Sequence, residues 1–268
     1  MRRGPSESAQ TVVLEAYGAR LAVSAPDGAP MHAILDGLPR GWAVADSGVR
    51  SDDVQWRFAL LADGDGYRIR DDQGREQPCV DVELAGALLR TQMRRFVGYH
   101  TDEFVFVHAG VVAYRGAGIV LPGRSFAGKS TLVRALVDAG AEFYSDEYAM
   151  FQRDGRVAHY REPLSIRGPE GQEEHDIGSP DPLEVVSVSL VALAVFRPGA
   201  AWAPSTLTTA AGIVAAMEHA IPARDRPAET LATLSRAFSG AVILQGERGE
   251  ADETARALLD GVKASSAP

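Results

Sequence analysis

The chain has 268 residues, of which 46% are hydrophobic and 24% charged, as in an ordinary globular protein of one large domain or two small ones. Its formal net charge of −9 argues against a nucleic-acid partner, because a phosphate backbone is bound by clustered lysine and arginine. No apolar run approaches the roughly 18 residues of a membrane span, and the N-terminus lacks an apolar signal segment, so we expect a cytoplasmic protein without a membrane partner.

The first part of the chain, up to residue 80, has the alternating pattern of β-structure. Strands are expected at residues 12–17, 20–24, 56–61 and 67–70, with Asp-Gly turns between the later ones and a short helix at residues 31–38. Cys79 is the chain's only cysteine, which excludes an internal disulfide framework and a cysteine-based zinc site. We therefore predict an N-terminal β-rich lobe over residues 1–80.

The pattern changes period at Asp81, where apolar residues at helical spacing predict an amphipathic helix to about residue 98. A strongly apolar run at residues 104–112 then predicts a strand that carries His108, and Arg115–Gly116 predicts a hairpin turn. A histidine in such a run is usually a hydrogen-bonded core residue, but this one lies one strand away from the next motif. We place the second domain at residues 81–268.

That motif is Gly123-x-x-x-x-Gly128-Lys129-Ser130, the spacing of a phosphate-binding P-loop, or Walker A sequence. An apolar strand pattern precedes it, a helical pattern follows it, and Gly140 ends the helix, which is the strand–loop–helix context that the motif needs. The expected nucleotide-binding residues are Gly123, Arg124, Ser125, Phe126, Ala127, Gly128, Lys129, Ser130 and Thr131.

The residue types in this loop suit a bound triphosphate. Glycine allows backbone N–H groups to approach the phosphates, lysine places a point charge against them, and the serine hydroxyl binds Mg²⁺. Of 27 basic residues only Lys129 and Lys263 are lysine, so lysine is kept here in a chain that otherwise uses arginine. ATP and Mg²⁺ are therefore the expected ligands.

A short strand at residues 142–145 is followed by the carboxylates Asp146 and Glu147, placed where Mg²⁺ or an attacking hydroxyl would be bound, although an exposed acidic turn is the alternative. Residues 157–167 predict further strand, and residues 168–182 a polar loop without periodicity that would close over nucleotide and acceptor or serve merely as a connection. Residues 185–196 predict a buried central strand. Helices at 211–220, 229–238 and 252–262 and a strand at 241–245 complete the chain.

The strand with His108, the hairpin, the loop and the Asp146–Glu147 pair together resemble the catalytic domain of the bacterial HPr kinase/phosphorylase family, over about residues 104–168. The resemblance implies an α/β P-loop kinase domain akin to phosphoenolpyruvate carboxykinase, and phosphorylation of a serine hydroxyl on a small protein. It implies that Lys129 binds the phosphates and that Asp146 deprotonates the acceptor. It also implies that His108 contacts the transferring phosphoryl group.

In the same resemblance Ser130 and Glu147 serve the metal, and Arg167 is a further catalytic residue. Ser165 stands where the family has a glutamate, and the family's late Pro-Gly-Arg-Asn segment is not recognisable. The nucleotide side is thus kept and the acceptor side altered, which makes HPr itself a doubtful acceptor.

The leading hypothesis is an ATP-dependent kinase for a hydroxyl group, most specifically a serine of a peptide or small protein, as in relatives that modify precursor peptides. The alternatives are a small-molecule kinase and a non-catalytic nucleotide-sensing module. Retention of Asp146 argues against the sensing module, whereas Ser165 keeps it open. The identity of the acceptor and the formation of homo-oligomers are left open by the sequence.

Overall fold

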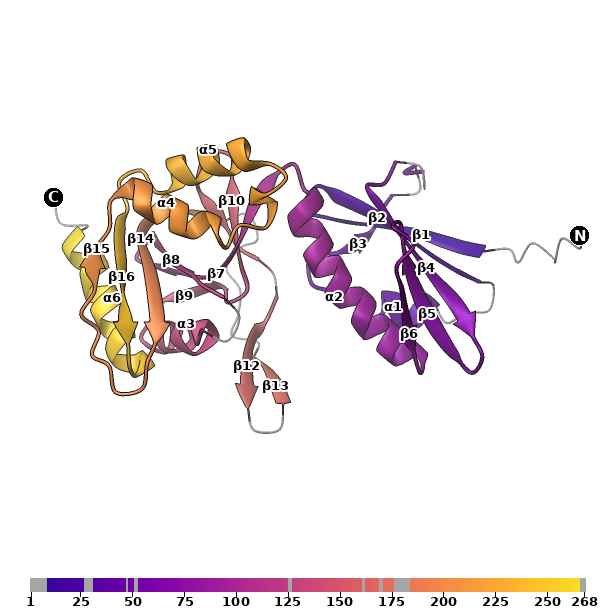
Figure 1. Ribbon diagram of the computed structural model, residues 1–268, viewed down its shortest axis with the longest axis horizontal. Coiled ribbons are helices and arrows are strands. Elements are labelled where there is room, and N and C mark those ends of the chain that lie inside the picture. Colours follow the sequence, from indigo (N-terminus) through magenta and orange to yellow (C-terminus); the bar gives the residue numbers. More distant parts are fainter. Residues whose placement is uncertain are drawn as a thin grey trace, which may run out of the picture. The chain divides into compact units, whose positions relative to one another are not determined.

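The computed structural model describes residues 9–26, 31–46, 48–50, 53–124, 127–160, 162–168, 171–175 and 184–265. The chain divides into two compact units, Met1–Asp102 and Glu103–Pro268, and Figure 1 shows both as mixtures of strands and helices. The division lies later than the boundary expected after residue 80, and the helix that follows residue 80 is responsible for the difference.

The first unit is a six-stranded sheet with the order β3-β1-β2-β4-β5-β6. Its elements are β1 (Ala9–Ala16), β2 (Ala19–Pro26), α1 (Met31–Leu35), β3 (Ala43–Val44), β4 (Trp56–Asp63), β5 (Gly66–Asp71), β6 (Glu76–Cys79) and α2 (Val82–His100). β2 and β4 are parallel, whereas the other neighbours are antiparallel. The β-rich character expected for this part of the chain is present, with β3 and β6 added.

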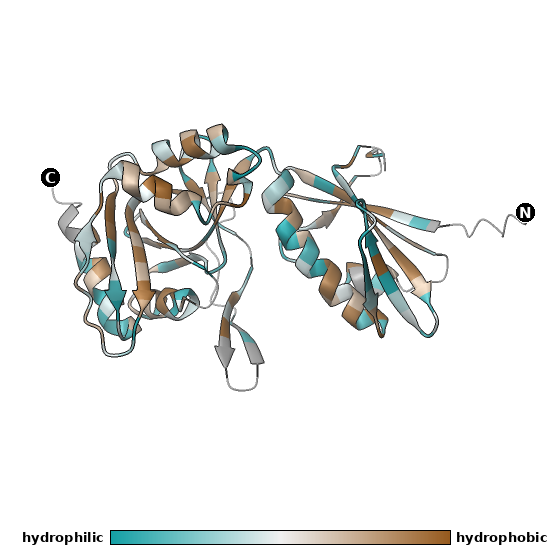
Figure 2. Ribbon diagram, in the orientation of Figure 1, coloured by the Kyte–Doolittle hydropathy of each residue, from teal (hydrophilic) through white to brown (hydrophobic). Residues whose placement is uncertain are grey.

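Helix α2 begins at its N-cap Asp81, whose carboxylate accepts a hydrogen bond of 2.8 Å from the Leu84 N–H. Leu89, Met93 and Phe96 lie on its buried face, and Figure 2 shows the helix carrying both hydrophobic and hydrophilic residues. The helix contacts α1, β5 and β6. It therefore packs in the first unit, and the change of period at Asp81 marks a new element rather than a new domain.

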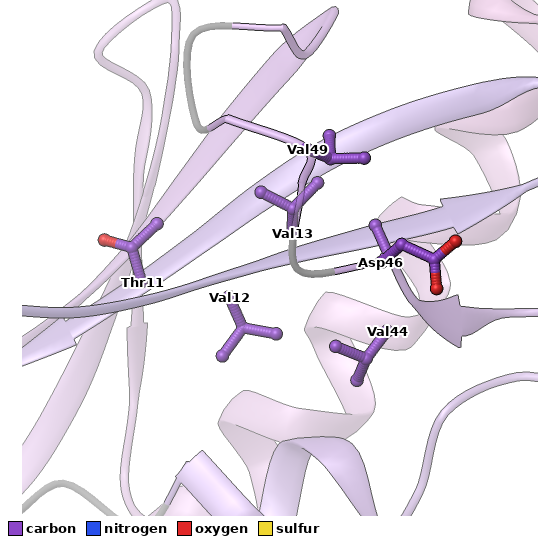
Figure 3. A pocket seen from close by; sticks show the side chains of 7 residues that line it. Thr11, Val12, Val13, Val44, Asp46 and Val49 are labelled. Carbon is purple, nitrogen blue, oxygen red and sulfur yellow. The ribbon is translucent and has the colours of Figure 1, made fainter.

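Two other features of the first unit are local. Cys79 at the end of β6 is buried, and burial raises the pKa of its thiol. A pocket of about 410 Å³ lies at the sheet edge, where β3 pairs with only Leu14 and Glu15 of β1. Figure 3 shows that its lining is mainly valine, with one carboxylate from Asp46.

The second unit is built on a sheet with the order β11-β10-β7-β8-β14-β16-β15, in which β9 also pairs with β7. Its elements are β7 (Phe104–Tyr114), β8 (Ala117–Pro122), α3 (Lys129–Asp138), β9 (Glu142–Ser145), β10 (Tyr148–Gln152), β11 (Val157–Ala158), β12 (Leu164–Gly168), β13 (Gly171–His175), β14 (Val185–Phe196), β15 (Ser205–Thr206), α4 (Thr209–Met217), the 3₁₀ helix η1 (Ile221–Ala223), α5 (Pro227–Ala237), β16 (Val242–Arg248) and α6 (Ala251–Ser265).

The sheet of the second unit has an apolar core on each face. One core contains residues of α4 and α5, and the other contains residues of α3 and α6. Strands β7, β8 and β14 contribute buried residues to both cores, which is why they read as nearly continuous apolar runs in the sequence. The unit is thus a three-layer α/β structure with helices on both faces of the sheet (Figure 1).

The expected hairpin between β7 and β8 is present. Arg115 and Gly116 both have positive φ, 53° and 77°, as a two-residue hairpin turn of the primed type requires. Strand β7 is antiparallel to β8 along residues 109–114, and its other edge pairs with β10 and then β9. This arrangement brings His108 and the turn after β9 toward the start of the loop that follows β8.

Several expectations need correction. Residues 168–182 were expected to be without regular structure, but Gly171–His175 forms β13 and pairs with β12. The remainder of that segment lies largely outside the described residues. Strands β10 and β15 were not expected. Across the part of the chain that the structure describes, no helix is both long enough and apolar enough to cross a membrane.

Candidate active site

Three parallel strands end at one edge of the second sheet. β14 pairs with β8 on one side and β16 on the other, and the last residues of β14 and β16, Phe196 and Arg248, are neighbours in register. The carboxyl ends of parallel strands are where ligands bind in open α/β sheets. The loop between Pro122, at the end of β8, and Lys129, at the start of α3, lies at this edge.

The described parts of the loop are fixed by backbone hydrogen bonds. The Gly123 N–H donates to the His108 carbonyl oxygen over 3.2 Å, which ties the start of the loop to β7. Gly128 is the N-cap of α3 with φ 75°, a left-handed conformation that favours glycine. Ser125 and Phe126 lie outside the described residues, and Arg124 and Thr131 are exposed.

Lys129 is the first residue of α3. Its Nζ donates to the Arg124 carbonyl oxygen over 2.9 Å, so the side chain folds back over the loop. Burial lowers the pKa of Lys129 to about 8, and the carboxylates of Asp146 and Glu147 oppose that shift. A lysine whose charge is only partly compensated is well suited to bind an anion at neutral pH.

Ser130 and Asp146 meet directly. The Ser130 hydroxyl donates to Oδ2 of Asp146 over 2.6 Å, and the Ser165 N–H donates to the same oxygen over 3.3 Å. Asp146 is 8% exposed, and burial raises the pKa of its carboxyl group in spite of these hydrogen bonds and of Lys129. The loop, the turn after β9 and strand β12 therefore converge on one carboxylate.

The turn that carries Asp146 is formed by its neighbour. The Ser145 hydroxyl oxygen accepts hydrogen bonds from the N–H groups of Glu147 and Tyr148, at 3.1 and 2.9 Å. The Glu147 carbonyl oxygen accepts from the Ala109 N–H, which anchors the turn to β7. Glu147 is partly exposed, and its charge reaches Lys129 as one of the influences on the lysine pKa.

His108 lies on β7 beside this group. Burial, followed by the charges of Lys129 and His219, lowers the pKa of His108 to about 4, so its ring is neutral at pH 7. Its backbone N–H donates to the His219 carbonyl oxygen over 2.8 Å. Burial also lowers the pKa of His219, and Lys129 and Arg124 add to that effect. A neutral His108 can donate one hydrogen bond and accept another.

Arg248 and His219 are two residues of this region that the sequence did not indicate. Arg248, 2% exposed, donates from Nη2 to the Gly128 carbonyl oxygen over 2.7 Å and from Nη1 to that of Gly249 over 2.9 Å. Its Nε is buried without a hydrogen-bond partner among the described residues, and burial lowers the pKa of the guanidinium. No local motif marks Arg248, because its loop contact spans 120 residues.

The two hydrogen bonds to the Gly128 carbonyl oxygen also fix the direction of the next backbone N–H group. In a trans peptide unit the carbonyl and the following N–H point in opposite directions. Because Arg248 and the Leu132 N–H both bind the Gly128 oxygen, the Lys129 N–H is directed away from them, toward the loop. An N–H with this direction at a helix start is the kind of donor that binds phosphate.

The donor set also fits Mg²⁺, which takes one or two protein oxygen ligands besides phosphate oxygens and water. The Ser130 hydroxyl can serve as one such ligand, and the Glu147 carboxylate, whose charge acts on Lys129, can serve as the other. Within the described ranges, no group of three or more histidine, cysteine or acidic side chains is placed to hold a metal ion. Arg167 lies on β12, where its side chain is outside the described residues.

No family model matches the chain, and no curated protein matches it. Among solved structures, it is similar to the HPr(Ser) kinase/phosphatase from Coxiella burnetii, with 15% sequence identity, coverage of 59% of this chain and 95% of that chain, and a TM-score of 0.37. This is a distant structural similarity.

Proposed function

We propose that the protein is an ATP-dependent kinase that transfers the γ-phosphoryl group to a hydroxyl, specifically a serine of a peptide or small protein. The observation that carries the proposal is the 2.6 Å contact of Ser130 with Asp146, because it joins the glycine-lysine-serine loop to a buried carboxylate. A phosphate-binding loop alone would suit any nucleotide-binding protein. A carboxylate of raised pKa beside it supplies the proton acceptor that a kinase needs.

In the proposed reaction the loop holds the triphosphate, with Gly128, Lys129 and Thr131 supplying backbone N–H groups and Lys129 its ammonium group, while Gly123 begins the loop. Bound Mg²⁺, held by Ser130 with help from Glu147, supplies neutralisation of the phosphate charge. The acceptor oxygen attacks the γ-phosphorus, the bond to the β–γ bridging oxygen breaks, and the leaving group is ADP. The acceptor's proton passes to Asp146, whose raised pKa favours proton uptake.

His108 and Arg167 complete the proposal. The neutral His108 ring acts as a hydrogen-bond partner of the transferring phosphoryl group rather than as a cation, because its pKa of about 4 leaves it uncharged at pH 7. Arg167 follows Ser165 on β12, and the Ser165 N–H binds Asp146, so the backbone of this strand reaches the carboxylate. We assign to Arg167 the stabilisation of negative charge on the transferring phosphoryl group.

The test is transfer of label from γ-labelled ATP, with Mg²⁺, to serine-containing peptides, including those encoded by neighbouring genes. Label is expected on serine, and a peptide with serine replaced by alanine is the matched control.

Lys129→Ala should lose most affinity for Mg-ATP in calorimetric titration, and Lys129→Arg should not restore it, because a planar guanidinium replaces a point charge poorly. Unchanged binding in both variants would contradict the assignment of the loop.

A further inference from the structure

Phe196 is a large apolar residue that remains 45% exposed at the last position of β14. It stands directly beside the loop, because a Cβ built on Gly128 would lie 3.8 Å from the Phe196 Cβ. Arg248 lies against its ring, with the guanidinium carbon 5.2 Å from the ring centroid. An exposed aromatic ring held in place by a buried neighbour at a ligand-binding edge is a candidate contact for part of the ligand.

The order of the strands in the sheet indicates which part of the ligand Phe196 would contact. β8, which leads into the loop, has β7 on one side and β14 on the other. His108 and the turn with Asp146 belong to the β7 side, whereas Phe196 and Arg248 belong to the β14 side. A triphosphate in the loop with its γ-phosphate toward Asp146 therefore directs its nucleoside end toward β14 and β16.

We propose that Phe196 is the nucleobase subsite of this enzyme, on which the base of the bound nucleotide stacks. The inference rests on the proposed function and deepens it. Arg248 fixes the Phe196 ring and at the same time holds the Gly128 carbonyl group, so the base contact and the phosphate loop share one support. Because stacking uses a π-face that every base has, it binds the base without strong discrimination, and ATP and GTP are both accepted.

The experiment measures the affinities of Mg-ATP, Mg-GTP and Mg-tripolyphosphate by calorimetric titration of the whole chain. Tripolyphosphate has the phosphates without the base. Phe196→Ala should weaken ATP and GTP about 10-fold or more, the scale of one base–aromatic stack, and leave tripolyphosphate unchanged. Phe196→Trp should retain wild-type affinity for both nucleotides.

Two further variants control for packing. Phe196→Leu keeps an apolar side chain beside Arg248 but removes the π-face, so it should weaken the nucleotides as Phe196→Ala does. Val195→Ala changes the preceding residue of the same strand, which is 61% exposed, and should change none of the three affinities. Thermal melting of each variant establishes that it is folded.

The outcomes are distinct. Equal losses for nucleotides and tripolyphosphate in Phe196→Ala would show that Phe196 supports the loop and would overturn the base subsite, as would an unchanged nucleotide affinity. In both cases the proposed kinase would stand. If the wild-type chain bound neither nucleotide nor tripolyphosphate, the proposed nucleotide site itself would fail, and the base subsite with it.

Discussion

The Asp146 carboxylate accepts a serine hydroxyl and a backbone N–H through one oxygen, Oδ2. Asparagine at this position keeps the shape of the side chain and can accept the same hydrogen bonds, but it cannot take up the acceptor's proton. Asp146→Asn should therefore retain Mg-ATP affinity and lose about 10²–10⁴ in turnover. Asp138→Asn, which removes an exposed carboxylate paired with Arg134 on α3, is the matched control and should keep wild-type turnover. Wild-type turnover in Asp146→Asn would mean that the base lies elsewhere.

If Lys129 binds the phosphates as proposed, the affinity for nucleotide should depend on pH. In the free protein its pKa is about 8, and a bound triphosphate raises that value, so binding takes up a proton once the pH exceeds about 8. Mg-ATP affinity should fall as pH rises above 8, by up to about tenfold per pH unit. Lys129→Arg stays charged in this range, so its weaker binding should be independent of pH. Titration calorimetry from pH 7 to 9.5 makes the comparison, and a pH-independent wild type would contradict the role of Lys129.

The lowered pKa of Lys129 also makes the free energy of unfolding depend on pH when no nucleotide is bound. Between the folded pKa of about 8 and the ordinary value of 10.5, the unfolded chain binds more protons at Lys129 than the folded chain, so this residue makes the free energy of unfolding rise with pH across that window. His108 gives the same sign between pH 4 and 6.5, because its folded pKa is also lowered. Asp146, with its raised pKa, acts in the opposite direction.

Arg248 is a buried cation whose hydrogen bonds go to two carbonyl groups. Buried charges are costly to fold around, and an apolar residue of similar length often keeps or raises stability. Arg248→Met should therefore keep or raise the melting temperature, yet weaken both Mg-ATP and Mg-tripolyphosphate about tenfold or more, because the Lys129 N–H loses its fixed direction. The exposed Arg256→Met is the control. A loss of binding that is accompanied by partial unfolding would leave Arg248 a merely structural residue.

At the scale of elements, α3 packs on β7 through a position that admits no side chain. A Cβ on Gly110 would lie 2.6 Å from Cγ2 of Val133, a residue buried between the helix and the sheet. Gly110→Ala should lower the free energy of unfolding by about 1–3 kcal/mol, the usual cost of overpacking, as measured by urea denaturation. Gly261→Ala, on α6 with open space around it, should instead raise it by about 0.5–1 kcal/mol.

Val133→Ala provides the check on that mechanism. If the methyl group added by Gly110→Ala clashes with the Val133 side chain, the double variant Gly110→Ala/Val133→Ala should be more stable than the sum of the two single changes predicts. Strict additivity would show that Gly110 matters for another reason.

Elements with strong local signals were predictable from the sequence. The hairpin at Arg115–Gly116, the strand with His108 and the strand–loop–helix around Gly128 follow from turn chemistry and apolar period. The two-residue strands β3 and β15 were not predictable, because so short a stretch has no period. The apolar spacing of α2 predicts a helix, but it does not indicate which of the two units the helix packs in.

The candidate site divides in the same way. Lys129 and Ser130 were named from the spacing of the loop motif, and Asp146 from its place after a short strand and from the family resemblance. The Ser130–Asp146 contact is now an observed distance, whereas the chemical roles of these residues remain predictions. Arg248 and Phe196 could not be named, because their importance comes from the parallel pairing of β14 with β16, which aligns residues that are far apart in sequence.

At the scale of the whole molecule, each unit has its own buried residues, and every residue assigned to the nucleotide lies in Glu103–Pro268. We expect residues 103–268, produced alone, to fold and to bind Mg-ATP with the affinity of the whole chain, and residues 1–102 to fold without binding it. Circular dichroism and calorimetric titration test both. A folded 103–268 fragment without nucleotide affinity would show that the first unit contributes to the site.

Cys79 gives the chain a built-in reporter of the first unit. It is the only cysteine, it is 5% exposed, and its raised pKa keeps it as the less reactive thiol. A thiol reagent can therefore modify it appreciably only when β6 opens, so the rate of labelling follows the opening of this one unit while the rest of the chain is silent. The rate of Cys79 labelling with and without nucleotide therefore measures, without any engineered probe, whether nucleotide binding to the second unit changes the opening of the first.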